Sequence, residues 1–104
     1  MLFSLVKSIY ENKATKIIHH YRPEFLLRQE LDIYLEIDNR KIGIEYQGVQ
    51  HFKPVEYFGG EEGFKKNVER DKRKLRLCVE NHFELYYVRY DEEVTPELIR
   101  SLIG

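Results

Sequence analysis

Two alternating runs of apolar and polar residues, joined by a short turn, are the strongest constraint on how this chain folds. Apolar residues occupy every second position from Leu31 to Ile37 and again from Ile42 to Tyr46. A period of two is typical of β-strands that bury one face. Between the runs, Asp38 and Asn39 tolerate the positive φ of a tight turn. The sequence therefore predicts an antiparallel β-hairpin.

A two-residue turn fixes which side chains face each other across this hairpin. In that register Asp32 falls opposite Glu45, and the next pair along the same face is Glu30 with Gln47. The opposite face pairs apolar residues, Ile33 with Ile44 and Leu35 with Ile42. This apolar match supports the register, whereas a three-residue loop or a bulge would shift it.

Two carboxylates placed directly opposite each other need a compensating partner. The Cβ atoms of such a pair lie about 4.5–5.5 Å apart, where like charges destabilise the sheet. A divalent cation would offset the repulsion, and Mg²⁺ favours one or two carboxylates, several waters and a phosphate. The alternatives are a bridging Arg or Lys, or a proton shared by Asp32 and Glu45. Gly43, beside the pair, fits a close approach by a ligand or another backbone.

A metal ion and a bridging Arg or Lys predict opposite effects on the stability of the metal-free protein when Glu45 is removed. If the pair awaits a metal, removing Glu45 relieves a repulsion worth up to about 1 kcal/mol, so stability holds or rises slightly. If a buried Arg or Lys bridges the pair, removing Glu45 costs about 3–5 kcal/mol.

Helix and strand patterns flank the hairpin on both sides. We expect helices over about 2–11 and 60–81, strands over 17–21 and 83–90, and a last helix that begins at Thr95. The apolar stripe of the long helix is expected to comprise Phe64, Val68, Leu75 and Cys78. That helix would connect the hairpin to a parallel fourth strand. The predicted fold class is α/β, a single domain over 1–104 with an αβββαβ core and a mixed four-stranded sheet flanked by helices.

Charge is concentrated on the long helix. The net charge of the chain is -1, which counts against a generic nucleic-acid binder. Residues 65–76 nevertheless carry seven basic and two acidic side chains. A solvated helix face explains such a run as readily as a nucleic-acid contact. The candidate contacts are Lys65, Lys66, Arg70, Lys72 and Lys74.

The cysteine and histidine residues indicate the cellular compartment and bear on whether the chain binds zinc. Cys78 is the single cysteine, so no intrachain disulfide can form, and a reducing, cytoplasmic location is expected. The four histidines and Cys78 lack zinc-ligand spacing. No apolar run approaches the roughly 18 residues of a membrane span, and the start of the chain lacks the pattern of a signal peptide. We therefore expect no membrane partner.

Several short segments together carry a family resemblance. They are Tyr21-Arg22-Pro23, Leu31-Asp32-Ile33-Tyr34, Ile44-Glu45-Tyr46-Gln47-Gly48, Gln50-His51-Phe52, Phe58-Gly59-Gly60-Glu61-Glu62-Gly63 and Glu69-Arg70-Asp71. An Asp on one strand and Glu-x-Lys on the next is the motif of the PD-(D/E)xK, or restriction-endonuclease-like, superfamily. From about residue 16 to 91 the chain resembles bacterial and phage domains similar to very-short-patch-repair endonucleases.

The resemblance implies a metal-dependent endonuclease that hydrolyses phosphodiester bonds in DNA, with Mg²⁺ or Mn²⁺ as cofactor and DNA repair as a setting. Asp32 and Glu45 would be metal ligands, and the backbone carbonyl of Tyr46 a third. Gln47 stands in place of the superfamily's lysine and can only orient groups through hydrogen bonds. The candidates to restore the missing positive charge are Lys74 and Arg70.

Three more residues are candidates for roles at this site. His51, just past the second hairpin strand, could act as a general acid or base or contact phosphate, or be an ordinary loop histidine. Asp71 lies on the apolar stripe, and a buried Asp needs a partner; a structural role is favoured over a catalytic one. The partners considered for it are Arg70, Lys74 and Arg22. Glu30 could hydrogen-bond Gln47 and support it.

A second function class stays open, a non-catalytic nucleic-acid-binding or interaction module with the same fold. The intact pair of Asp32 and Glu45 favours the nuclease, whereas Gln47 and the near-neutral net charge favour the module. Double-strand cleavage would suggest a homodimer. The superfamily often has an acidic residue on its first helix, and residues 1–10 contain none. This suggests a chain that is N-terminally shortened relative to the family.

Overall fold

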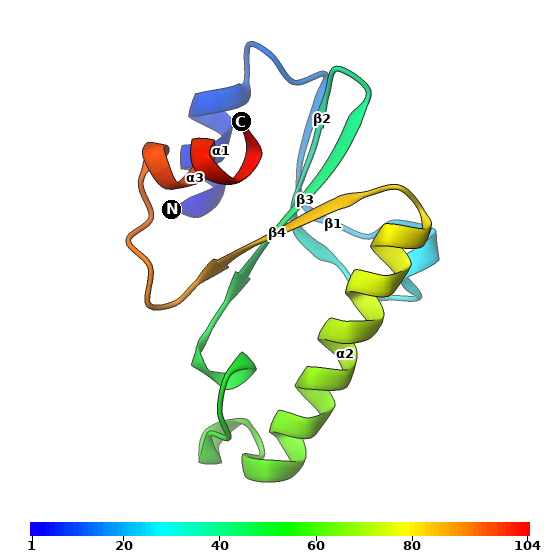
Figure 1. Ribbon diagram of the computed structural model, residues 1–104, viewed down its shortest axis with the longest axis vertical. Coiled ribbons are helices and arrows are strands. Elements are labelled where there is room, and N and C mark those ends of the chain that lie inside the picture. Colours follow the sequence, from blue (N-terminus) through cyan, green and yellow to red (C-terminus); the bar gives the residue numbers. More distant parts are fainter.

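The computed structural model describes residues 1–104 and places three helices around one four-stranded sheet (Figure 1). The helices and strands are α1 (Leu2–Tyr10), β1 (Lys16–Tyr21), β2 (Leu31–Ile37), β3 (Arg40–Gln47), α2 (Gly60–Glu80), β4 (Glu84–Arg89) and α3 (Pro96–Ile103). Three short 3₁₀ turns lie in the connections, η1 (Glu24–Leu26), η2 (Val49–His51) and η3 (Glu56–Phe58). The expected mixed α/β order is confirmed, whereas the 3₁₀ turns were not predicted.

The predicted hairpin forms, and its register holds over most of its length. Asp38 and Asn39 occupy the turn with φ of 48° and 69°, the left-handed values that a tight hairpin turn requires. β2 and β3 then pair antiparallel in the predicted register as far as Ile33 opposite Ile44. The regular ladder ends there, one pair before the two carboxylates.

The sheet has the strand order β1-β2-β3-β4, and β4 runs parallel to β3 while the other neighbours are antiparallel. α2 makes the connection between the parallel strands, as expected. α1 and α3 lie together on one side of the sheet and α2 lies on the other (Figure 1). The hydroxyl of Tyr10 on α1 donates to the carbonyl of Gly104, directly after α3, so the first and last helices form one layer.

Each face of the sheet has its own apolar cluster. The cluster under α1 and α3 contains Val6, Tyr10, Ile33, Leu35, Ile37, Ile42, Ile44, Val88, Ile99 and Ile103. The smaller cluster under α2 and η1 contains Leu26, Leu31, Tyr34 and Cys78. Burying one large apolar side chain contributes about 1.5–3 kcal/mol. The α1/α3 face therefore supplies most of the core burial, and the α2 face leaves room for polar groups.

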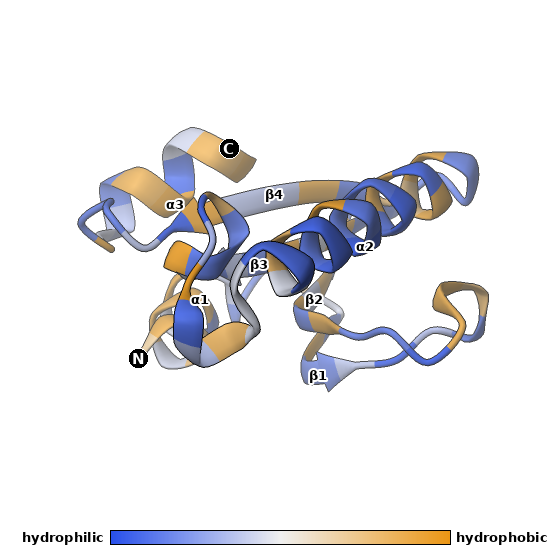
Figure 2. Ribbon diagram, turned by 90° about the horizontal axis from the view of Figure 1, so that it is seen from below, coloured by the Kyte–Doolittle hydropathy of each residue, from blue (hydrophilic) through white to orange (hydrophobic).

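Helix α2 turns a surface of mixed apolar and polar side chains toward the rest of the fold. Its inward positions include Asp71, which contacts His51 of η2, and Lys74, which forms an ion pair with Glu45 of β3. The predicted apolar stripe is wrong at Leu75, which is 42% exposed, because the helix is rotated to bring these polar groups inward. Figure 2 shows the hydrophilic colouring along α2 beside the more apolar α1 and α3. None of the helices has both the length and the apolar character needed to cross a bilayer.

Gly43 on β3 is approached by side chains, not by a second backbone. A Cβ at this position would lie 3.0 Å from Cδ1 of Leu31 and 3.2 Å from Cδ1 of Leu85. The two leucines therefore occupy the space that a side chain at Gly43 would need, and they fill the cluster under α2. This packing explains the glycine without a bound ligand.

We expect Gly43→Val to destabilise the fold by about 1–3 kcal/mol, because overpacking forces neighbouring side chains out of their preferred rotamers. Urea denaturation followed by circular dichroism measures the loss. The matched control is Lys41→Val, an exposed position on the same strand, which should change stability by no more than about 0.5 kcal/mol. Equal effects of the two substitutions would contradict the packing argument.

Candidate functional site

The two predicted carboxylates lie where β2 and β3 separate. Regular alternation would put Leu31 and Tyr34 on opposite faces of β2, yet both pack in the cluster under α2. The alternation of β2 is therefore broken next to Asp32. Because of this break, Asp32 does not follow the regular pleat of the strand at the point where the ladder ends.

Each carboxylate accepts a hydrogen bond from the backbone of the other strand. The N–H of Asp32 donates to Oε2 of Glu45 at 2.9 Å, and the N–H of Tyr46 donates to Oδ2 of Asp32 at 2.8 Å. The predicted facing pair is thus replaced by two side-chain-to-backbone bonds across the gap. Because the N–H and C=O of a strand residue point to the same side, the carbonyl of Tyr46 also faces this gap.

Glu45 is buried and forms an ion pair with Lys74 of α2. Burial raises the pKa of the Glu45 carboxyl, and the Lys74 ammonium opposes this shift. Lys74 also donates to the backbone carbonyl of Glu30 at 2.7 Å. Of the three ways considered to compensate the carboxylates, the structure has the bridging lysine at Glu45.

The positive charge beside Glu45 comes from Lys74 of α2. Gln47 pairs with Arg89 in the parallel ladder, and its carbonyl accepts the N–H of Tyr90. Lys74 was one of two candidates for this charge, and it is the one that reaches Glu45. Arg70, the other, stays exposed on α2. Lys74 is correspondingly unavailable as an outward nucleic-acid contact, which corrects that part of the prediction.

His51 of η2 and Asp71 of α2 form a second polar pair. Nδ1 of His51 lies 2.8 Å from Oδ2 of Asp71, and both side chains are mostly buried. The partner of Asp71 is therefore His51 and not one of the cations considered from the sequence. An ionised carboxylate only accepts hydrogen bonds, so Nδ1 of His51 is the donor in this pair, and Nε2 makes no hydrogen bond within the chain.

Tyr87 of β4 lies close to both pairs and was missed by the sequence reasoning. It is the ladder partner of Glu45. Burial, followed by the charges of Asp71 and Glu45, raises the pKa of its hydroxyl to about 12. Tyr87 therefore stays neutral beside the carboxylates. Only the parallel register, which the sequence does not specify residue by residue, brings it there.

Glu30 does not contact Gln47, and this expectation is corrected. Its Oε1 lies 3.0 Å from Nδ1 of His20, and its Oε2 accepts from Nε of Arg22 at 3.0 Å. The hydrogen bond from Arg22 is the main reason that the pKa of Glu30 is lowered. Glu30 turns away because the β2–β3 ladder has already ended, so no regular pair holds it opposite Gln47.

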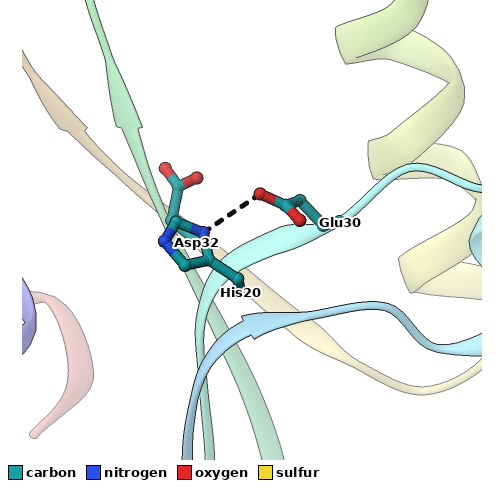
Figure 3. A group of neighbouring side chains, drawn as sticks. All are labelled: His20, Glu30 and Asp32. Carbon is teal, nitrogen blue, oxygen red and sulfur yellow. Dashed lines mark hydrogen bonds and ion pairs between the residues drawn. The ribbon is translucent and has the colours of Figure 1, made fainter.

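His20, Glu30 and Asp32 form a cluster beside the gap (Figure 3). One potential ligand atom from each side chain lies within 4.8 Å of the others. His20 is the member that the sequence reasoning missed. Its φ of 59° is left-handed, a conformation in which histidine is several-fold enriched. No turn motif in the neighbouring sequence predicts this conformation.

The remaining basic candidates lie on the outer surface of α2. They are Lys65, Lys66, Arg70 and Lys72, and all four are exposed and form no ion pair. Free, exposed ammonium and guanidinium groups are available to neutralise phosphates. The helix thus has one basic outer surface and one polar inner surface that meets the candidate site.

Comparison with known proteins finds a viral relative of unknown function. The chain is 34% identical over 85 residues to uncharacterized protein 307L of Invertebrate iridescent virus 6, an alignment that covers 72% of this chain and 43% of that relative. The chain therefore spans less than half the length of that protein. No family model matches the chain. No solved structure matches it either.

The ion pair between Glu45 and Lys74 can be tested with a double-mutant cycle. We expect Glu45→Gln and Lys74→Met each to lower stability by about 3–5 kcal/mol, because either change leaves one buried group without its partner. The double variant should recover most of this loss. Urea denaturation in EDTA measures all four proteins.

The control for this cycle is an exposed pair on the same helix. Arg76 and Glu80 approach to 3.8 Å with side chains 65% and 59% exposed, so Glu80→Gln should change stability by less than about 0.5 kcal/mol. If the losses at Glu45 and Lys74 add in the double variant, the two groups do not act as a pair.

Proposed function

We propose that this domain is a metal-dependent DNA endonuclease with a restriction-endonuclease-like core. The observation that carries the proposal is the contact between Lys74 and Glu45 beside Asp32. Two carboxylates and an ammonium at the end of a β-hairpin are the charged groups that the family resemblance requires. Here the ammonium comes from α2 because Gln47 stands at the position of the superfamily's lysine.

The side chains at the gap fit a hard divalent cation. Oδ1 of Asp32 accepts no hydrogen bond, whereas Oδ2 accepts one, and each carboxylate oxygen can accept more than one. Mg²⁺ or Mn²⁺ would be held by Asp32, Glu45 and the carbonyl of Tyr46, and would polarise a phosphoryl oxygen and lower the pKa of bound water. The donor set consists of oxygens, as Mg²⁺ prefers.

Three further groups have roles that follow from their positions. Lys74 brings a positive charge that stabilises negative charge developing on the phosphoryl oxygens. His51, with Nδ1 held by Asp71, can take or give a proton at Nε2. The exposed basic residues of α2 would contact the phosphates of the DNA backbone. All of these groups lie on or beside α2, so one helix would connect DNA binding to the site of cleavage.

A plasmid-nicking assay in Mg²⁺ or Mn²⁺ tests the proposed activity. We expect the parent protein to nick supercoiled DNA, Asp32→Asn to abolish nicking, and Lys74→Met to slow it by about 10²–10³ because a charge-stabilising group is lost. The control is Glu36→Gln, on the same strand but away from the gap, where it binds Tyr34; it should keep full activity.

The assay also separates the two function classes. Gln47 and the fully paired Glu45 favour a non-catalytic nucleic-acid-binding module. A parent protein that binds DNA but leaves it intact with either metal would establish that module and refute the nuclease. Nicking that persists unchanged in Asp32→Asn would point to a contaminating enzyme.

The basic surface of α2 makes a separate prediction about binding. Replacing Lys65, Lys66 and Lys72 with Ala should weaken DNA binding and reduce the slope of log K against log salt by up to about 3, since each phosphate contact contributes about 0.9. Fluorescence anisotropy over a salt series measures both. The control removes three exposed cations on the α1/α3 side, Lys7, Lys13 and Arg100. Equal slopes for both triple variants would mean that the α2 cluster is only a solvated face.

A further inference from the structure

A histidine and two carboxylates converge at the open end of β1 and β2. His20 is the last but one residue of β1, Asp32 is the second residue of β2, and Glu30 directly precedes that strand. Their potential ligand atoms all lie within 4.8 Å of one another. Figure 3 shows the imidazole of His20 beside the two carboxylates, with its contact to Glu30 drawn as a dashed line.

The register of β1 and β2 explains why these side chains meet. The ladder pairs His19 with Ile33 and Tyr21 with Leu31, but the pair between them, His20 and Asp32, is absent from it. In a regular strand, successive side chains alternate between the two faces. His20 and Asp32 occupy opposite positions in this register, where side chains share a face, and they stay close although the ladder is interrupted between them and His20 has a left-handed conformation.

The charges of the cluster are only partly compensated. Glu30 has both oxygens engaged, one by Arg22 and one by His20. Asp32 has a single hydrogen bond, from the backbone of Tyr46. Two carboxylates this close repel each other unless a positive charge lies between them. A cation in contact with all three side chains would supply it.

The cluster also borders a hollow in the surface. A cavity of about 180 Å³ is lined by His20 and Asp32 together with six further residues, which are Met1, Leu2, Phe3, His19, Ile33 and Tyr46. A metal with three protein ligands keeps open positions, which water or a ligand must fill. The cavity provides that space on the side of Asp32 away from α2.

We propose that His20, Glu30 and Asp32 bind a divalent transition-metal ion such as Mn²⁺. An imidazole ligand suits transition metals, whereas Mg²⁺ prefers oxygen ligands. This site lies on the β1 side of Asp32, and the gap that would hold the nuclease cation lies on its β3 side. The proposal shares Asp32 with the proposed function, but it stands whether or not the domain cleaves DNA.

Metal titration of the full chain tests the site without any DNA. His20→Asn removes the imidazole, and His82→Asn is the matched control, because both histidines are exposed and have φ near 60°, 59° and 62°, which Asn tolerates. Calorimetry with Mn²⁺ should show that His20→Asn weakens binding at least about tenfold, while His82→Asn leaves it unchanged. The affinity for Mg²⁺ should change by less than about twofold in both variants.

A spectroscopic signature identifies the ligand directly. Electron spin echo envelope modulation of bound Mn²⁺ should show a coupled imidazole nitrogen in the parent and in His82→Asn, and none in His20→Asn. Failure of Mn²⁺ to bind, or a nitrogen coupling that survives His20→Asn, would overturn the proposal. A parent protein that binds Mn²⁺ but does not nick DNA would refute only the nuclease proposal. Failure of the proposed function can therefore be told from failure of this metal site.

Discussion

The buried ion pair between Glu45 and Lys74 determines how the long helix meets the sheet. A buried pair of this kind gains little net stability, because removing both charges from water offsets most of their attraction. The pair instead affects how the helix is oriented, because either charged group would be costly to bury without the other. Two further polar contacts act beside it, His51 with Asp71 and the Asn67 amide with the carbonyl of Gln50. The rotation of α2 about its axis therefore follows from these polar partners together with the apolar packing of Leu77 and Cys78.

This dependence explains what could be predicted from the sequence. Alternation of period two located both hairpin strands, and two turn residues that tolerate positive φ set the register. These signals are local, so they can be recognised without knowledge of how the rest of the chain folds. The apolar stripe predicted for α2 was correct at Cys78 and wrong at Leu75. Helical periodicity cannot determine the rotation of a helix whose inward side chains are held by charges on other elements.

The candidate site was predictable in its residue types more than in its contacts. Asp32 and Glu45 stood out because alternation put both on one strand pair. The partners of Glu45, Asp71 and Glu30 all come from other elements or from across a broken ladder. Several cations were plausible for Glu45 and Asp71, and Gln47 was the expected partner of Glu30. The interruption beside Asp32 has no signature in the sequence, because neither His20 nor Leu31 is a residue that marks an irregular strand. A regular extrapolation of the hairpin therefore continued past its last pair, Ile33 with Ile44, to Asp32 with Glu45 and to Glu30 with Gln47.

The layer formed by α1 and α3 has a consequence for the order of folding. The hydrogen bond from Tyr10 to Gly104 spans 94 positions of the chain, whereas the hairpin joins neighbours in sequence. Contacts between distant segments require the closure of a large loop and form slowly. During synthesis the hairpin can pair as soon as β3 has left the ribosome, while α1 must wait for α3. Until then the part of this face that Ile99 and Ile103 of α3 cover stays exposed on the nascent chain.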